Sequence, residues 1–174
     1  MRLHDQIDFL KKNYGLTLEK EKAVLLMHDL MFRCVYESPD LCLMPGIESF
    51  LTWIQTQSCK RGVVTSSGRI VLDSVFKRFN LEGFFPLTIT STDLGELPGK
   101  PEPYPYLMAS ERLGISPSEC VSFEDSVHGF TSAKRAGMKT IAVNALIPAT
   151  DYPLADLFVN SFEDPGIISF LSRA

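Results

Sequence analysis

The sequence predicts an α/β fold: a parallel, Rossmann-like sheet core with helices on both faces, preceded by a smaller helical region. From Pro45 onward, short apolar runs of strand length alternate with longer amphipathic stretches of helix length. Such alternation is typical of a parallel sheet. Before Pro45, apolar residues recur at helical spacing and no strand pattern is seen. We therefore divide the chain into a partial helical cap, residues 1–42, and an α/β core, residues 43–174.

Each predicted element follows from its local pattern. Residues 1 to about 38 should form two helices with a break at Gly15 and Thr17, and Pro45-Gly46 then marks a turn. Apolar residues at helical spacing predict core helices at residues 47–55, 70–79, 105–113 and 127–136. Short apolar runs predict strands at residues 61–65, 87–89, 120–123, 140–143 and 157–159.

Composition narrows the class of protein. The 174 residues carry a formal net charge of −4 and 45% hydrophobic residues, as expected for a globular chain with a real core. A small negative net charge lacks the excess of positive charge that binding to nucleic acid or to an anionic membrane requires. Neither a transmembrane run nor a signal-peptide pattern is seen, and the four cysteines form no CxxC pair. We predict a cytoplasmic protein without nucleic-acid or membrane partners, and make no prediction of its oligomeric state.

The first polar cluster, Thr65-Ser66-Ser67, follows a predicted strand and leads into a predicted helix. Ligands of open parallel sheets gather beyond the carboxyl ends of the strands. Hydroxyl and backbone N–H groups before a helix N-terminus can cradle a phosphate. The alternative is that Ser66 or Ser67 only caps the following helix.

Two further clusters lie near the same predicted edge. Lys100 stands between Gly99 and two nearby prolines, on a stiff turn from which its ammonium could neutralise phosphate or carboxylate charge. The alternative is an exposed surface lysine. Glu124 and Asp125 directly follow an apolar strand, and adjacent carboxylates suit magnesium. They could instead be acids that cap the next helix.

The order of the three clusters is more specific than any one of them. A strand followed by Thr/Ser, then Gly-Lys-Pro-x-Pro, then an apolar strand with Glu-Asp-Ser-x-x-Gly resembles the haloacid dehalogenase-like (HAD) hydrolase superfamily. The resemblance favours the branch with β-phosphoglucomutase and sugar-phosphate phosphatases. It covers Pro45 to about Asp164 well and the helical front more loosely. Met44-Pro45-Gly46 and Ala136-Gly137-Met138 are supporting matches.

The resemblance implies a role for each matched residue. Thr65 would hydrogen-bond the transferring phosphoryl group, and Ser66 and Ser67 would line the same phosphate pocket. Lys100 would orient the attacking aspartate and balance the phosphate charge. These are our candidate catalytic and phosphate-binding residues.

The resemblance also implies Mg²⁺ as the cofactor of the complete enzyme. Asp125 would be the direct metal ligand, and Glu124 would support it. We expect this chain alone to bind the metal weakly or not at all, because the family's catalytic loop also supplies ligands.

The family's first motif, an apolar strand ending in Asp-x-Asp-Gly-Thr, has no counterpart here, since the chain contains no Asp-x-Asp. In the family, its first aspartate attacks phosphorus and its second acts as the general acid and base. Its strand lies centrally, between those that end here at Thr65 and Phe123. We therefore expect an N-terminally truncated chain, inactive alone and poorly stable unless it recruits a strand.

The leading hypothesis is a HAD-type phosphatase that hydrolyses a small phosphorylated metabolite through an aspartyl-phosphate. One alternative is a non-catalytic protein that retains the phosphate-binding residues for a ligand or partner. Another is a phosphomutase of the same family.

Overall fold

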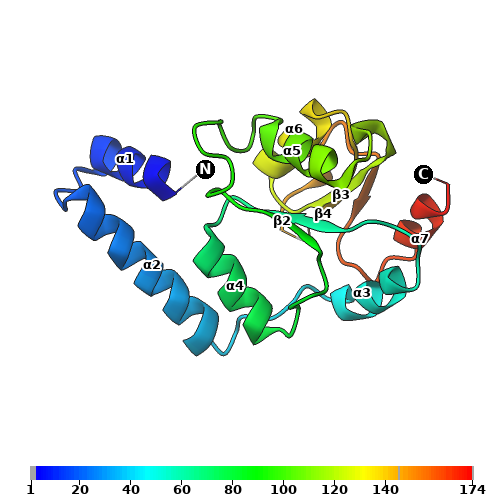
Figure 1. The fold of residues 1–174 in the computed structure, drawn as a ribbon, viewed down its shortest axis with the longest axis horizontal. Coiled ribbons are helices and arrows are strands. Elements are labelled where there is room, and N and C mark those ends of the chain that lie inside the picture. Colours follow the sequence, from blue (N-terminus) through cyan, green and yellow to red (C-terminus); the bar gives the residue numbers. More distant parts are fainter. Residues whose placement is uncertain (1–2, 145, 174) are drawn as a thin grey trace.

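The structure, a computed structural model, describes residues 3–144 and 146–173 (Figure 1). Its α-helices are α1 (Leu3–Tyr14), α2 (Lys20–Glu37), α3 (Ile47–Gln55), α4 (Arg69–Arg78), α5 (Tyr104–Leu113), α6 (Val127–Arg135) and α7 (Gly166–Leu171). Its strands are β1 (Gly62–Val64), β2 (Leu87–Ile89), β3 (Val121–Glu124), β4 (Lys139–Val143) and β5 (Leu157–Val159). Two short 3₁₀ helices, η1 (Pro117–Glu119) and η2 (Ala149–Asp151), complete the described elements.

The strands are parallel but form two separate sheets. β1 pairs with β2, with Val63 opposite Thr88. β4 lies between β3 and β5, with Phe123 opposite Ile141. Within the described residues, no backbone ladder joins β1 to β3. The predicted parallel α/β class is confirmed, and the sheet is divided where the sequence analysis expected a central strand to be missing.

Helices cover both faces of the strands, as predicted. Ile141 and Val143 of β4 are buried in a cluster with Ile167 of α7, and Phe50 of α3 packs against it. Ala142, whose side chain alternates to the other face, is buried with Phe130 of α6. Figure 1 shows α5 and α6 on one side of the strands and α3 and α4 on the other. Both faces therefore have an apolar core.

The helical front end extends away from the sheets as the arm α1–α2 (Figure 1). Arg78 of α4 fastens this arm. Its guanidinium donates to the carbonyl of Val35, to that of Ser38 at 2.8 Å and to that of Leu41 at 3.1 Å. The two front helices are confirmed. The division into residues 1–42 and 43–174 stays a prediction, and its positions 1, 2, 145 and 174 lie outside the described residues.

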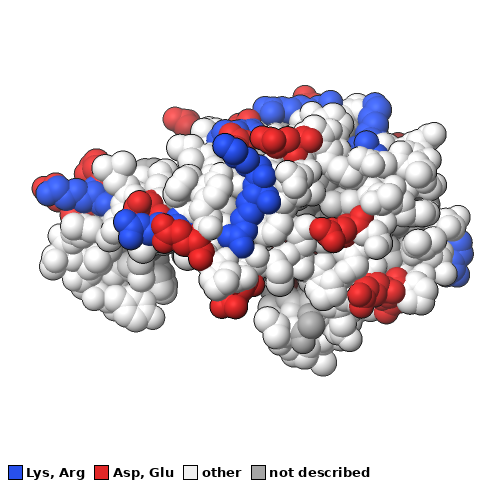
Figure 2. Space-filling view, turned by 90° about the horizontal axis from the view of Figure 1, so that it is seen from below, with Lys and Arg blue, Asp and Glu red and all other residues white. Residues whose placement is uncertain are grey.

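The surface shows no separation of charge on the face seen in Figure 2. There, Lys and Arg side chains lie among Asp and Glu side chains rather than in a patch of their own. Throughout residues 3–144 and 146–173, no helix combines the length and apolar character needed to cross a bilayer.

Candidate functional site

Lys100 contacts both sheets, which we call the β1–β2 half and the β3–β4–β5 half. Its side chain is only 10% exposed. The ammonium Nζ lies 3.0 Å from the carbonyl oxygen of Val64, the last residue of β1, and 2.5 Å from Oε1 of Glu124, the last residue of β3. The alternative of an exposed surface lysine is therefore wrong. Lys100 links the carboxyl ends of two strands that share no ladder.

The hydroxyl loop after β1 is held by its own main chain and by the segment after β2. The N–H of Thr65 donates to Ile89 O at 2.9 Å, and Thr65 Oγ1 accepts from the N–H of Ser67 at 3.1 Å. The N–H of Ser91 donates to Ser67 O at 3.1 Å. The N-cap of α4 is Gly68, and no side chain caps it. The capping alternative for the serines is therefore wrong, and Thr65 follows the Val64 carbonyl that Lys100 contacts.

Glu124 is a buried carboxylate with a crowded environment. Its side chain is 6% exposed, and Oε1 accepts hydrogen bonds from Lys100 and from the hydroxyl of Tyr106. A Cβ placed on Gly129 would lie 1.8 Å from Glu124 Oε2, so only glycine leaves room for the carboxylate. Burial raises the pKa of Glu124, while the Lys100 ammonium opposes that rise.

Asp125 differs from its neighbour because its side chain faces solvent. It is exposed, and among the described residues nothing donates a hydrogen bond to its carboxylate. The cap of α6 is Ser126, whose Oγ accepts from the N–H of Gly129 at 3.1 Å, so the capping alternative for the two acids is wrong. Proteins often bind Mg²⁺ through one or two carboxylates, together with phosphate oxygens and water. The free carboxylate of Asp125, next to the hydrogen-bonded carboxylate of Glu124, suits such a site.

The described residues hold no group of three or more His, Cys, Asp or Glu side chains arranged to bind a metal. Asp125 and Glu124 are thus two adjacent carboxylates without a third such side chain arranged beside them in the described part of the chain. The structure brings Lys100, the residues flanking Thr65 and the Glu124-Asp125 pair to one edge. The individual roles assigned to them stay predictions.

Sequence reasoning missed Tyr106, and it used Gly129 only as the last residue of the Glu-Asp-Ser-x-x-Gly motif, without foreseeing its contact with Glu124. Tyr106 is 6% exposed, and besides its bond to Glu124 its hydroxyl lies 3.4 Å from Lys100 Nζ. Burial and the nearby Glu124 raise its pKa well above the ordinary value, so the hydroxyl stays a donor. One signal was available: Tyr106 occupies the buried face of a predicted helix, and a buried tyrosine hydroxyl needs a partner.

A second carboxylate, Asp93, lies past the end of β2 and is tied into its own half-sheet. Its Oδ2 accepts from the N–H of Thr90 at 2.8 Å, from Thr90 Oγ1 at 2.6 Å and from Arg69 at 3.0 Å. Burial alone would raise the pKa of Asp93, but the bonds from Thr90 and the charge of Arg69 outweigh it and lower that pKa. All of these donors belong to the β1–β2 half.

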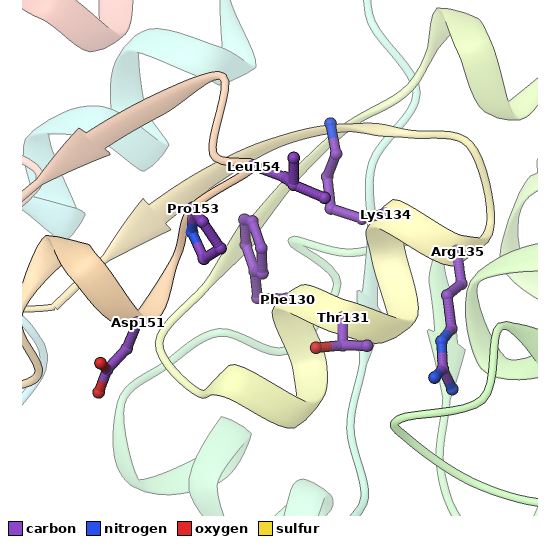
Figure 3. A pocket seen from close by; sticks show the side chains of 7 residues that line it. All are labelled: Phe130, Thr131, Lys134, Arg135, Asp151, Pro153 and Leu154. Atoms are coloured by element: carbon purple, nitrogen blue, oxygen red, sulfur yellow. The ribbon is translucent and has the colours of Figure 1, made fainter.

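A surface cavity of about 440 Å³ beside α6 is separate from this edge, because none of the candidate residues lines it (Figure 3). Its two cations are already paired: Lys134 with Asp156 at 2.8 Å, and Arg135 with Glu102 at 2.9 Å. Figure 3 shows their charged ends pointing in opposite directions. The cavity therefore does not gather charge around one anion.

The family model for haloacid dehalogenase-like hydrolases matches residues 9–143. The Bacillus subtilis (strain 168) protein named "Putative phosphatase YhcW" is 34% identical over 143 residues, covering 82% of this chain and 63% of that protein. Hexitol phosphatase B of Escherichia coli (strain K12) is 31% identical, with coverages of 70% and 55%. Beta-phosphoglucomutase of Bacillus subtilis (strain 168) is 30% identical, with coverages of 70% and 51%. The chain thus spans between half and two-thirds of these relatives.

Solved structures show the same fold. CbbY from Rhodobacter sphaeroides in complex with phosphate superposes with a TM-score of 0.82 at 19% identity, covering 95% of this chain and 75% of that one. Beta-phosphoglucomutase from Clostridium difficile gives a TM-score of 0.79 at 22% identity, with coverages of 98% and 76%.

Proposed function

Because this chain belongs to the haloacid dehalogenase-like hydrolases, we propose that it forms the charge-balancing part of a phosphatase that hydrolyses a small phosphorylated metabolite. The observation that carries the proposal is the position of Lys100. Its ammonium contacts both the β1 end, next to the Thr65 hydroxyl, and the β3 end, next to Asp125. A phosphoryl group held at this edge would meet a hydroxyl donor, a cation and a metal-binding carboxylate together.

The residues divide the work by charge. Thr65 would donate its hydroxyl hydrogen bond to a phosphoryl oxygen, and Ser66 and Ser67 would line the same pocket. Lys100 would neutralise part of the negative charge that spreads over the equatorial oxygens during transfer. Two of its three N–H donors are committed to Val64 and Glu124, and the third faces the Tyr106 hydroxyl at the longer distance of 3.4 Å. That third donor is the one a phosphate would take.

Mg²⁺, which the family resemblance implies, would be held by Asp125 with support from Glu124. When bound, it would neutralise phosphate charge at the end of β3. The fit rests on the free, exposed carboxylate of Asp125. Glu124 is a weaker candidate for direct contact, since Oε1 is shared by two donors and Oε2 lies against Gly129.

The attacking carboxylate would come from outside these 174 residues, because they contain no Asp-x-Asp. It would bond to phosphorus while the ester oxygen leaves with a proton. Water would then cleave the aspartyl-phosphate and release inorganic phosphate. We propose that such a carboxylate enters between β1 and β3, where Lys100 is in reach. The 174-residue chain alone should therefore show no turnover.

The test compares the chain alone with the chain fused to an apolar segment that ends in Asp-x-Asp-Gly-Thr. Release of phosphate from p-nitrophenyl phosphate with MgCl₂ should be absent from the chain alone and present in the fusion. Asp125→Asn should abolish it. Turnover by the chain alone that Asp125→Asn removes would contradict our account of the missing nucleophile.

One observation favours the non-catalytic alternative, namely that the 174 residues contain no Asp-x-Asp, whereas the presence of Thr65, Lys100 and both acids speaks against it. Under that alternative, the chain would bind inorganic phosphate, Lys100→Met would weaken binding, and the fusion would not turn over. A phosphomutase would instead return the phosphoryl group to a sugar hydroxyl, seen as isomerised sugar phosphate rather than free phosphate.

A further inference from the structure

Asp125 is held in place entirely through its main chain. Its carboxylate is exposed and accepts no hydrogen bond from described residues, but its carbonyl oxygen accepts two. The hydroxyl of Tyr152 donates to it at 2.7 Å, and the side-chain Nδ2 of Asn144 donates as well. Two bonds use the full acceptor capacity of a carbonyl oxygen. These two donors therefore fix the peptide from which the Asp125 side chain projects.

Both donors are themselves anchored. Tyr152 is 2% exposed, and its ring packs edge-on against Phe130 at a centroid distance of 5.2 Å. Asn144 follows β4, and its N–H donates to Val159 O of β5 at 3.0 Å. Its Oδ1 accepts the N–H of Leu146 at 2.7 Å and that of Ile147 at 2.9 Å. Both donors thus belong to the three-stranded sheet and its loops, and their own packing and hydrogen bonds hold them in place.

We propose that Tyr152 and Asn144 are positioning residues that fix the Asp125 peptide, so that its carboxylate projects from the end of β3 toward the cation. The inference rests on the proposed function, which makes Asp125 the metal ligand. It adds two residues that lie 19 and 27 positions further along the chain. Neither belongs to the three sequence clusters.

The physical reason is geometric. Between the last residue of β3 and the Ser126 cap of α6, the Asp125 peptide is the only link. Without its two donors this peptide could rotate, and the unpaired carboxylate would turn with it. Groups that orient a metal ligand typically contribute about 10–100-fold to metal affinity. Loss of the Tyr152 hydroxyl alone should cost about tenfold, because Asn144 still holds the carbonyl.

The experiment uses the full chain and two NMR readouts. Tyr152→Phe removes the hydroxyl and keeps the ring against Phe130. Tyr36→Phe is the matched control, since Tyr36 is 41% exposed on α2, far from β3 along the chain. The first readout, without metal, is the ¹³C shift of the Asp125 carbonyl, which reports the hydrogen bonds it accepts. The second is line broadening by Mn²⁺ around Asp125 and its displacement by MgCl₂.

Support requires that Tyr152→Phe shifts the Asp125 carbonyl signal and weakens Mn²⁺ binding about tenfold, while Tyr36→Phe changes neither. Asn144→Ala should act in the same direction, and it decides the matter if Tyr152→Phe does not fold. If Asp125→Asn weakens Mn²⁺ binding but neither positioning variant does, the inference is overturned and the proposed metal site stands. If Asp125→Asn also leaves Mn²⁺ broadening unchanged, the proposed metal site is wrong, and the inference fails with it.

Discussion

The β1–β2 and β3–β4–β5 halves each place a carboxylate near a strand end, and the two carboxylates behave differently. Asp93 accepts its hydrogen bonds from Thr90 and Arg69 of its own half, and its pKa is lowered. Glu124 is buried, has a raised pKa, and is paired with Lys100, which also contacts the other half. Asp93 therefore stabilises only the β1–β2 sheet, to which it belongs. Glu124 shares Lys100 with Val64 of β1, so its ion pair stabilises the contact between the two sheets.

The surroundings of the two carboxylates also differ in what they leave available to a ligand. The donors around Asp93 leave its Oδ2 fully committed, so it has little to offer a ligand. Around Glu124, by contrast, the exposed Asp125 and a loosely engaged N–H of Lys100 remain available. We therefore expect substitutions around Glu124, at Lys100 or Asp125, to affect both stability and ligand binding. Substitutions at Asp93 should affect stability only.

The largest expected effect comes from removing the shared cation. Lys100→Met would leave the Glu124 carboxylate buried without its partner, which should cost about 3–5 kcal/mol at pH 7. Urea unfolding followed by circular dichroism measures the loss. The double variant Lys100→Met/Glu124→Gln should recover much of it. A single variant as stable as the wild type would remove the distinction between the two carboxylates.

The next effect concerns the space around Glu124. Gly129→Ala would place a methyl group where Oε2 now lies, and overpacking of this kind costs about 1–3 kcal/mol. In a Glu124→Ala background the same change should be neutral or stabilising, because alanine is the better helix former. The comparison of the two free energies of unfolding isolates the clash. An equal cost in both backgrounds would show that the glycine matters for another reason.

Asp93→Asn should have a smaller effect, about 1 kcal/mol, because the Asp93 side chain is 23% exposed and solvent screens part of the interaction with Arg69. Asp73→Asn, on the exposed side of α4, is the matched control and should change stability little. Phosphate and metal binding should be unaltered in both variants. Loss of binding in Asp93→Asn would mean that this acid belongs to the site after all.

The smallest effect is the pH dependence, in which the two acids should have opposite signs. Asp93 has a lowered pKa. Its contribution to the free energy of unfolding is therefore complete above pH 3.8, the ordinary pKa, and is lost as the pH falls through the lower folded-state pKa. Glu124 has a raised pKa, so its contribution is present below 4.5 and is lost as the pH rises through the folded-state pKa. We would measure the free energy of unfolding against pH for the wild type and for each variant. The difference between the wild type and Asp93→Asn, and that between the wild type and Glu124→Gln, should change with pH in opposite directions.

Much of the fold was predictable because it is written in local patterns. Residues 47–55, 87–89 and 157–159 match α3, β2 and β5 at both ends. Helix α7 was missed because its six residues are too few to show a helical period. The strand at residues 61–65 was predicted two residues too long, since Arg61 and Thr65 lie outside the β1 ladder.

The site was only partly predictable. Three clusters could be placed at one edge because parallel strands end together, and Lys100 does lie there. The sharing of Lys100 between Val64 and Glu124 could not be predicted, since it depends on how two half-sheets approach each other. Tyr152 gave no signal, because it stands in a loop without periodicity and contacts a main-chain oxygen rather than a motif side chain.

The three carbonyls gathered by Arg78 have a mechanical consequence. One guanidinium binds the C-terminal end of α2 and the connection that follows it, in addition to the packing of α2 against α4, so its loss should loosen the arm α1–α2 about residues 38–45. In Arg78→Ala, a distance probe between α1 and α5 should report a broadened distribution, while the sheets keep their order. Arg78 would then be one of the contacts that restrict how far the helical arm moves relative to the sheets.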